Sequence, residues 1–402
     1  MEENKAKWFY LICGAAGMLV IGVIYAWSIL KAPLADEFGW GVADLALNFT
    51  LTLCFFCVGG VIGSNLSAKV SPRVTLLAAA ACLFGGFFIC SGMSGGSIAV
   101  LYMAYGGLGG IGIGMANNAI VSQCNAWFPG QRGTSTGVLM MCFGFSSLLL
   151  GKLAAALIEI PDIGWRGTYR VIGICTAAVL VPLAFILRMP KENEAAAAAP
   201  KADGKTEERI EYDSKAMVRR PSFWKFYLYS ILTCAVGSTV ISFARDLALS
   251  VGASVALATT LVGVLSLCNG IGRILFGLIF DRIGRRRTML ASNLLTIIAP
   301  ATILVALFAG SLPLSIAGFC LTGIAYGSSP TISAAVVSEL YGMRYYPKNY
   351  SLANTMVIFA SVMSTVAGKM IELTGGAYAP VFMVLLVFAV LALVLNFSIK
   401  KA

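Results

Sequence analysis

The sequence predicts an all-α membrane protein in which twelve transmembrane helices form two six-helix bundles. Three observations support this prediction: the composition, the length of the apolar segments, and the placement of the basic residues. Hydrophobic residues occupy 58% of the 402 positions and charged residues only 12%, whereas an ordinary soluble domain has about 25% charged residues. A soluble fold could not bury this much apolar surface, but lipid tails solvate it.

Apolar segments long enough to cross a bilayer occur throughout the chain. The first follows Lys5 and Lys7, and at about 23 residues it exceeds the apolar core of a cleaved signal peptide. We therefore predict an uncleaved first helix. The twelve predicted spans are residues 8–30, 44–66, 74–93, 98–124, 134–158, 168–187, 222–244, 255–280, 288–309, 313–338, 350–371 and 377–398.

The net charge of +11 is concentrated in alternate loops, which is typical of membrane orientation and does not call for a nucleic-acid partner. The loops on the opposite side are acidic or uncharged, as at Asp36, Glu37 and Asp44. The positive-inside rule then places both termini in the cytoplasm of a multi-pass protein of the cell (inner) membrane. The basic residues on the predicted cytoplasmic side are Lys69, Arg73, Arg132, Arg282, Arg285, Arg286, Arg287, Arg344, Lys348, Lys400 and Lys401.

The long polar segment 189–221 separates the two halves. It contains five alanines at 195–199 followed by Pro200, together with mixed charges. We expect a cytoplasmic linker, with a short surface helix near Tyr212–Arg220, between an N-terminal bundle at 1–188 and a C-terminal bundle at 222–402.

The two halves carry a weak internal repeat. Aligning Asp281 with Ala68 also places Arg286 opposite Arg73. Repeats of this kind are how secondary transporters build two bundles around a midplane binding site.

Glycines in the fourth segment match the residue spacing of a nucleotide-binding motif but not its structural context. The run from Gly107 to Gly112 has the GxGxxG spacing, but it lies inside a predicted helix with no preceding strand. Gly106, Gly110 and Gly114 recur every four residues and predict a smooth face for close helix packing.

Neither a metal nor a cofactor is expected. Histidine is absent, and the Cys54–Cys57 pair has no second pair to complete a zinc site. The sequence also offers no nucleophile with its base and no phosphate-binding loop, so we do not expect an enzyme.

Arg273 is the most informative residue, because it lies inside the eighth segment. An arginine at the centre of a membrane helix costs about 2.5–3.5 kcal/mol on insertion scales, so it should face a watery cavity and an anion. Asn269 precedes it by one helical turn and shares its face. A guanidinium binds a planar carboxylate through two hydrogen bonds. The alternative is a structural arginine that pairs with backbone carbonyls or extends to the interface.

The run from Gly277 to Arg286, with Asp281, Arg282, Gly284 and Arg285, resembles the loop signature of the major facilitator superfamily. The resemblance implies the major facilitator fold and a gating role for Asp281, Arg282, Arg285 and Arg286. The first-half copy has Ala68 in place of the acid. Simple anchoring of the loop by its arginines is the alternative interpretation.

Several motifs also resemble the oxalate/formate antiporters, which are relatives of the monocarboxylate transporters. They are Arg273 with Asn269, Tyr25-Ala-Trp27-Ser, Trp127-Phe-Pro-Gly-Gln-Arg132-Gly, and Asn349-Tyr350. The resemblance implies an anion site between the bundles, centred on Arg273. The further positions that it assigns to substrate binding are Asn269, Tyr25, Asn117, Phe143, Tyr326 and Asn354.

The resemblance is incomplete at one position that bears on the cargo. The oxalate carrier has a lysine in its eleventh helix, and the matching residue here is Val357. A dianion in a low-dielectric site needs about two compensating cations, so the sequence favours a monocarboxylate over oxalate.

Lys152, Arg245 and Asp246 lie near the outer ends of their segments, where extension to the interface or mutual pairing would also explain them. Asp246 is the candidate for proton coupling. The expected function is a monomeric secondary active transporter that moves small organic carboxylate anions across the lipid bilayer by alternating access. A carrier for another cargo, such as drug efflux, and an anion sensor that does not transport are the alternatives.

Overall fold

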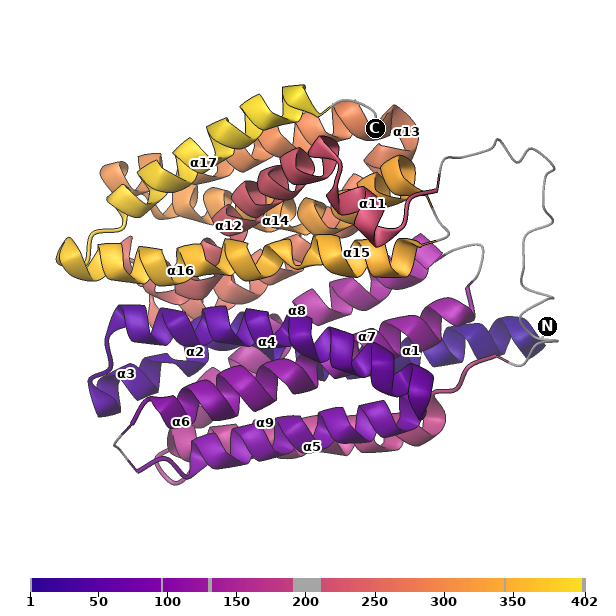
Figure 1. Cartoon of the computed structure of the whole chain (residues 1–402). Helices are drawn as coiled ribbons and strands as arrows, with labels where there is room; N and C mark the ends of the chain where they lie inside the picture. The colour runs from indigo at the N-terminus through magenta and orange to yellow at the C-terminus, as the bar shows by residue number, and fades with distance from the viewer. Residues whose placement is uncertain (1, 95–96, 129–131, 191–210, 343–344, 400–402) are drawn as a thin grey trace. The chain divides into compact units, whose positions relative to one another are not determined.

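The computed structural model describes residues 2–94, 97–128, 132–190, 211–342 and 345–399. It divides into two compact units, Met1–Lys201 and Ala202–Ala402, whose helices are labelled in Figure 1. Most of the predicted linker, including the alanines at 195–199, lies outside the described residues, as do Arg344, Lys400 and Lys401. The predicted bounds of the linker stay a prediction.

The first unit contains the six predicted spans of the N-terminal half. The first span is irregular: α1 (Glu2–Ile21) continues through the 3₁₀ segment η1 (Gly22–Ala26) into α2 (Trp27–Leu30). The fourth span also departs from α geometry, because the π-helical segment η2 (Tyr102–Gly109) lies between α6 and α7. The other elements are α3 (Ala32–Phe38), α4 (Val42–Lys69), α5 (Pro72–Ser91), α6 (Ala99–Leu101), α7 (Gly110–Ala126), α8 (Arg132–Ile158) and α9 (Gly164–Ile186).

The first helix described in the second unit is the short α11 (Ser214–Val218), which confirms the helix predicted near Tyr212–Arg220. The Asp213 side chain caps it by accepting a 2.8 Å hydrogen bond from the Ala216 backbone N–H. The membrane-spanning elements that follow are α12 (Pro221–Ser250), α13 (Val255–Ala309), α14 (Leu312–Tyr341), α15 (Tyr346–Asn354), α16 (Met356–Leu373) and α17 (Ala379–Ser398).

Helix α13 covers two predicted spans, 255–280 and 288–309. Its 55 residues would extend about 80 Å as one helix, far beyond the ~30 Å hydrocarbon core. Gly284 interrupts it with a φ of +74°, a conformation that favours glycine because a Cβ would clash there. The described residues include eleven helices long and apolar enough to span a membrane, and the interruption of α13 brings the number of spans to the predicted twelve.

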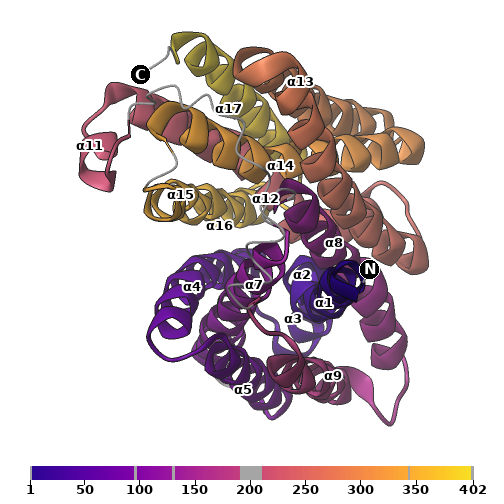
Figure 2. The same ribbon diagram turned by 90° about the vertical axis from the view of Figure 1, so that its right-hand side faces the viewer.

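The internal repeat is visible in atomic contacts. A Cβ added at Gly59 of α4 would meet the backbone of Ile111 in α7. A Cβ added at Gly272 of α13 would meet the backbone of Ile324 in α14 in the same way. The residue numbers of Gly272 and Gly59 differ by the same amount as those of Asp281 and Ala68, and so do those of Ile324 and Ile111. The structure therefore confirms the predicted repeat, and Figure 2 shows α4 beside α7 within the first unit.

The glycine face predicted in the fourth span is confirmed as a packing surface. A Cβ at Gly110 would lie 2.7 Å from the Thr52 carbonyl oxygen, and one at Gly114 would lie 2.8 Å from the Gly60 nitrogen. Real Cβ atoms do not approach this closely, so α4 and α7 can only pack in this way because these positions are glycine.

The same argument predicts the effect of a substitution in the second unit. Gly327→Ala should lower the melting temperature of the purified protein, because the new Cβ would overlap the Asn269 carbonyl and lie 3.0 Å from the Arg273 nitrogen. Overpacking of this kind costs about 1–3 kcal/mol. Gly85→Ala in α5 is the matched control, since its Cβ would meet nothing within 4 Å. Equal melting temperatures for both variants and wild type would contradict the packing argument.

Candidate anion-binding site

Arg273 lies in the first half of α13 and is half-buried. Helix α14 fixes its position: Gly323 and Gly327 pack against the α13 backbone around Asn269 and Arg273. The Thr331 hydroxyl also donates a 3.2 Å hydrogen bond to the Arg273 carbonyl oxygen. The guanidinium is therefore carried by a helix whose register against its neighbour is set by backbone contacts.

Asn269 is 1% exposed, and neither atom of its amide has a hydrogen-bond partner among the residues that the structure describes. The Ser266 hydroxyl, three residues earlier, is buried and unpaired in the same way. Buried polar groups are nearly always paired, and an unpaired one costs about 1–3 kcal/mol. Ser266, Asn269 and Arg273 follow one helical face, so this face offers donors and an acceptor to a ligand.

Tyr326 of α14 belongs to the same region. Cys234 of α12 lies beside the hydroxyls of Tyr326 and Ser329 and is close enough to Arg273 for an electrostatic interaction. Gly237 makes room for the tyrosine, because a Cβ there would overlap the Tyr326 ring. The structure thus brings together three of the predicted residues, Arg273, Asn269 and Tyr326. Sequence reasoning missed Cys234 and Ser329, since nothing in a single sequence shows which faces of α12 and α14 meet α13.

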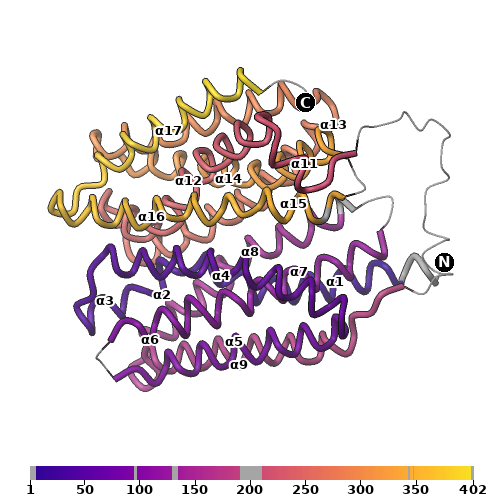
Figure 3. The backbone as a smooth tube through the Cα atoms, in the orientation of Figure 1, coloured from indigo at the N-terminus to yellow at the C-terminus, as the bar shows by residue number. Residues whose placement is uncertain are grey.

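Asn354 lies at the end of α15, immediately before Thr355, where the eleventh span changes from α15 to α16. Figure 3 shows the two helices following one continuous path. The Tyr227 and Thr355 hydroxyls form a 2.7 Å hydrogen bond at this junction. Val357, two residues further on, packs against the buried apolar cluster that includes Phe276 and Met356.

The first unit brings Tyr25 and Phe143 together. Tyr25 lies in η1 and its ring packs edge-on against Phe143 of α8, with ring centroids 5.3 Å apart. The Phe56 ring of α4 lies 6.4 Å from Phe143. Asn117, on α7, is half-buried, and its side-chain oxygen has no hydrogen-bond partner among the described residues. The two predicted aromatic residues therefore pack against each other as buried side chains of this unit.

The predicted gating residues cluster at the interruption of α13. Asp281, Arg282 and Arg286 are exposed. Arg285 is largely buried and forms a 3.1 Å ion pair with Glu339 of α14. Within the described part of the chain Asp281 forms no ion pair. Glu339, which sequence reasoning did not single out, thus supplies the carboxylate at this end of the second unit.

The other charged residues singled out by the sequence lie away from Arg273 along the chain. Arg245 and Asp246 are 4.0 Å apart near the end of α12, and Asp246 is within electrostatic range of Tyr378. Lys152 is exposed on α8. Lys31, which the sequence analysis did not consider, is 4% exposed at the end of α2.

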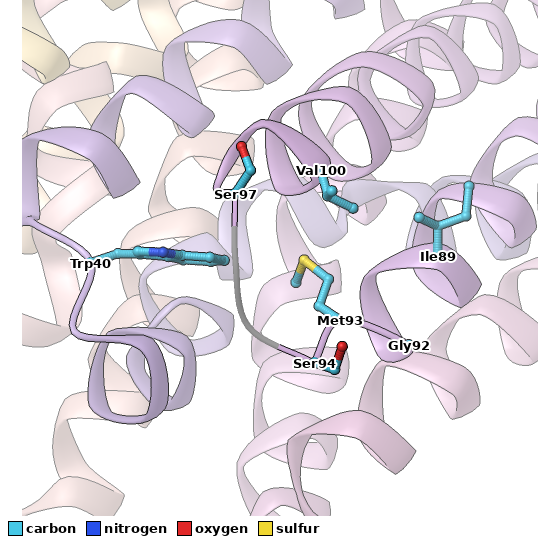
Figure 4. A pocket seen from close by; sticks show the side chains of 7 residues that line it. All are labelled: Trp40, Ile89, Gly92, Met93, Ser94, Ser97 and Val100. Atoms are coloured by element: carbon cyan, nitrogen blue, oxygen red, sulfur yellow. The ribbon is translucent and has the colours of Figure 1, made fainter.

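A hollow in the first unit contains none of the predicted residues (Figure 4). Next to it, Arg166 donates hydrogen bonds to the Met93 carbonyl oxygen at 2.8 Å and to Glu37 at 2.7 Å. Hydrogen bonds from Arg166 and Trp165 hold the pKa of Glu37 below its usual value. The hollow itself is lined by Trp40, Ile89, Gly92, Met93, Ser94, Ser97 and Val100. It has no charged lining residue, so it is a poorer anion site than the region of Arg273.

Comparisons with known proteins agree with this architecture. The chain is 25% identical over 349 residues to the oxalate:formate antiporter of Oxalobacter formigenes, covering 86% of this chain and 80% of the relative. It is 24% identical over 415 residues to monocarboxylate transporter 12 of Mus musculus, covering 94% and 82%. The solved structure of a D-xylose-proton symporter superposes with a TM-score of 0.76 at 15% identity, covering 97% of each chain.

A family model described as Major Facilitator Superfamily matches residues 10–244 and 230–401. These two segments reach all twelve spans and include both helix pairs of the internal repeat. The chain is therefore a multi-pass membrane transporter that belongs to the Major Facilitator Superfamily.

Proposed function

We propose that the protein is a secondary active transporter of small organic carboxylate anions and that it prefers monocarboxylates to oxalate. The observation that carries the proposal is the polar face of α13, where half-buried Arg273 follows the unpaired amide of buried Asn269. Arg273 binds the carboxylate through its planar guanidinium. Asn269 donates to the same group or accepts from a neighbouring hydroxyl of the cargo.

The resemblance also assigns residues of the first unit to cargo binding. Tyr25 and Phe143 form a packed aromatic pair with Phe56 nearby. Aromatic rings offer large apolar faces, so we assign them to the carbon skeleton of the anion. Asn117 is the polar residue of this unit that the resemblance assigns to substrate binding.

The relatives support the carboxylate class without fixing the cargo. One is named as an oxalate:formate antiporter and another as a monocarboxylate transporter. Because these relatives share only about one residue in four with the chain, their names indicate which class of cargo to test. The rival interpretation is a carrier for a different cargo, in which Arg273 is structural.

Transport proceeds by alternating access, as in other carriers built from repeats. The Arg285–Glu339 ion pair joins α13 to α14 at the interruption of α13. In our proposal it holds this end of the second unit together, and the exposed Asp281, Arg282 and Arg286 form and release ion pairs as the carrier opens and closes. Asp246 remains the candidate for proton coupling.

The topology can be tested directly. The basic loops predict that both termini and the 189–221 linker face the cytoplasm. On a cysteine-free background, a membrane-impermeant thiol reagent applied outside should label a cysteine at Ser94 and leave one at Ala202 unlabelled. The reverse labelling pattern would overturn the proposed orientation.

Arg273→Lys should reduce carboxylate uptake into proteoliposomes by about tenfold or more while the protein still inserts, because lysine keeps the charge but loses the planar fork. Arg170→Lys is a matched control. This arginine also lies in a spanning helix, where it donates a 3.3 Å hydrogen bond to Ser91, and its replacement should change uptake little. Near wild-type uptake by Arg273→Lys would favour the structural interpretation of Arg273.

The charge of the cargo follows from Val357, which supplies no second cation. Acetate, lactate and formate should compete for uptake better than oxalate. Val357→Lys should weaken monocarboxylate transport and improve competition by oxalate, whereas Val357→Leu, which also enlarges the side chain in the apolar cluster, should not. Wild-type protein that binds oxalate more tightly than every monocarboxylate tested would contradict the proposed preference.

A further inference from the structure

The internal repeat identifies the first-unit counterpart of Arg273. A Cβ at Gly327 would overlap the Asn269 carbonyl and lie 3.0 Å from the Arg273 nitrogen. A Cβ at Gly114 would overlap the Phe56 carbonyl and lie 2.8 Å from the Gly60 nitrogen. The two contacts match atom for atom, so Phe56 corresponds to Asn269 and Gly60 to Arg273.

The exposure of the flanking residues shows that the two positions also share a helical face. Val58, Val61 and Ile62, around Gly60, are 42%, 51% and 42% exposed. Their counterparts Ile271, Ile274 and Leu275, around Arg273, are 42%, 36% and 41% exposed. A side chain at position 60 would therefore start from the same place on α4 as Arg273 does on α13.

Helix packing does not explain the glycine at position 60. Its neighbours Gly59 and Gly63 are required, because their Cβ atoms would lie 2.7 and 2.8 Å from the Cα atoms of Ile111 and Met115. A Cβ at Gly60 would meet nothing within 4 Å. Glycine in a helix interior is less favourable than alanine by about 0.5–1 kcal/mol, and a larger residue would fit here.

We infer that Gly60 is a specificity-determining position whose missing side chain keeps the cargo site singly charged and open to monoanions. This inference rests on the proposed function. It adds a second residue that determines the charge of the cargo, outside the eleventh helix. A cation at Gly60 would supply the compensating charge that a dianion needs. Its absence also leaves space next to the aromatic residue Phe56 for the apolar end of the cargo.

The test compares Gly60→Arg with Gly60→Gln, which adds a long polar side chain without charge. Binding of acetate, lactate, oxalate and malonate is measured by competition for uptake in proteoliposomes. Gly60→Arg should improve the affinity for oxalate or malonate relative to lactate by about tenfold, which corresponds to 1.4 kcal/mol, and Gly60→Gln should leave the ratio at its wild-type value. An unchanged ratio in Gly60→Arg, or an equal change in Gly60→Gln, would overturn the inference.

A second route keeps the inference testable where Gly60→Arg does not fold. Gly60→Cys on a cysteine-free background is treated with a cationic methanethiosulfonate or with a neutral one of similar size, so that the charge is added after folding. Gly85→Cys, another position with open space, is the control. Only the cationic reagent at position 60 should shift the ratio toward the dianions. An equal shift with the neutral reagent, or no shift with either reagent on fully modified protein, would overturn the inference.

The same measurements separate this inference from the proposed function. If wild-type protein takes up no carboxylate, the proposed function fails and Gly60 loses its role with it. If Arg273→Lys retains uptake, the protein still transports carboxylates but the proposed role of Arg273 fails. If carboxylate uptake depends on Arg273 but the ratio never responds to charge at position 60, only the assignment of Gly60 fails.

Discussion

Close contact between helix backbones at glycine is the constraint on which this structure depends. Lipid is as apolar as leucine, so helices in a membrane gain little by burying large side chains against one another. Here α14 packs against α13, and α7 against α4, through glycines whose Cβ atoms would overlap the facing backbone. Such contacts allow only one register, because a shift by one residue would bring a side chain into the contact. This register fixes the positions of Arg273 and Asn269.

Because the scaffold is repeated, differences between its two copies are informative. The helix contact that carries Asn269 and Arg273 in the second unit carries Phe56 and Gly60 in the first. Packing is satisfied equally well by either pair. The charged and amide groups were therefore not required by the fold, which argues that they serve the cargo.

A second asymmetry runs in the opposite direction. In the first unit, Lys31 and Asn48 are buried near the end of their helices where Trp27 packs on Tyr105. By the offset of the α4–α7 and α13–α14 contacts, the counterpart of Asn48 in the second unit is Leu261, which is buried and apolar. This position of the repeated contact therefore does not require a polar residue.

The spans could be predicted from the sequence because their length and composition are set by the bilayer, which acts on each segment separately. Arg273 and Asn269 could also be placed on one face, since helical geometry fixes the relation between residues four apart. The Arg285–Glu339 pair and the position of Cys234 could not be predicted, because they depend on which helices meet. The role of Asn349 could not be predicted either, because the sequence identified it only as part of a family motif. In the structure its side chain forms 2.9 Å hydrogen bonds with Tyr212 and Ser214 and so fixes the start of α11.

The unpaired state of Asn269 bears on how cargo binding could drive transport. The Asn269 amide is buried and unpaired among the described residues, and a buried polar group without a hydrogen-bond partner costs about 1–3 kcal/mol. Under the proposed function, a carboxylate that pairs with Arg273 and Asn269 would remove that cost, whereas in a conformation open to water the amide is already hydrated. Cargo would then stabilise a conformation with the buried amide more than one with the hydrated amide. A ligand can shift a conformational equilibrium only through such a difference in affinity, and the polar face of α13 would supply it.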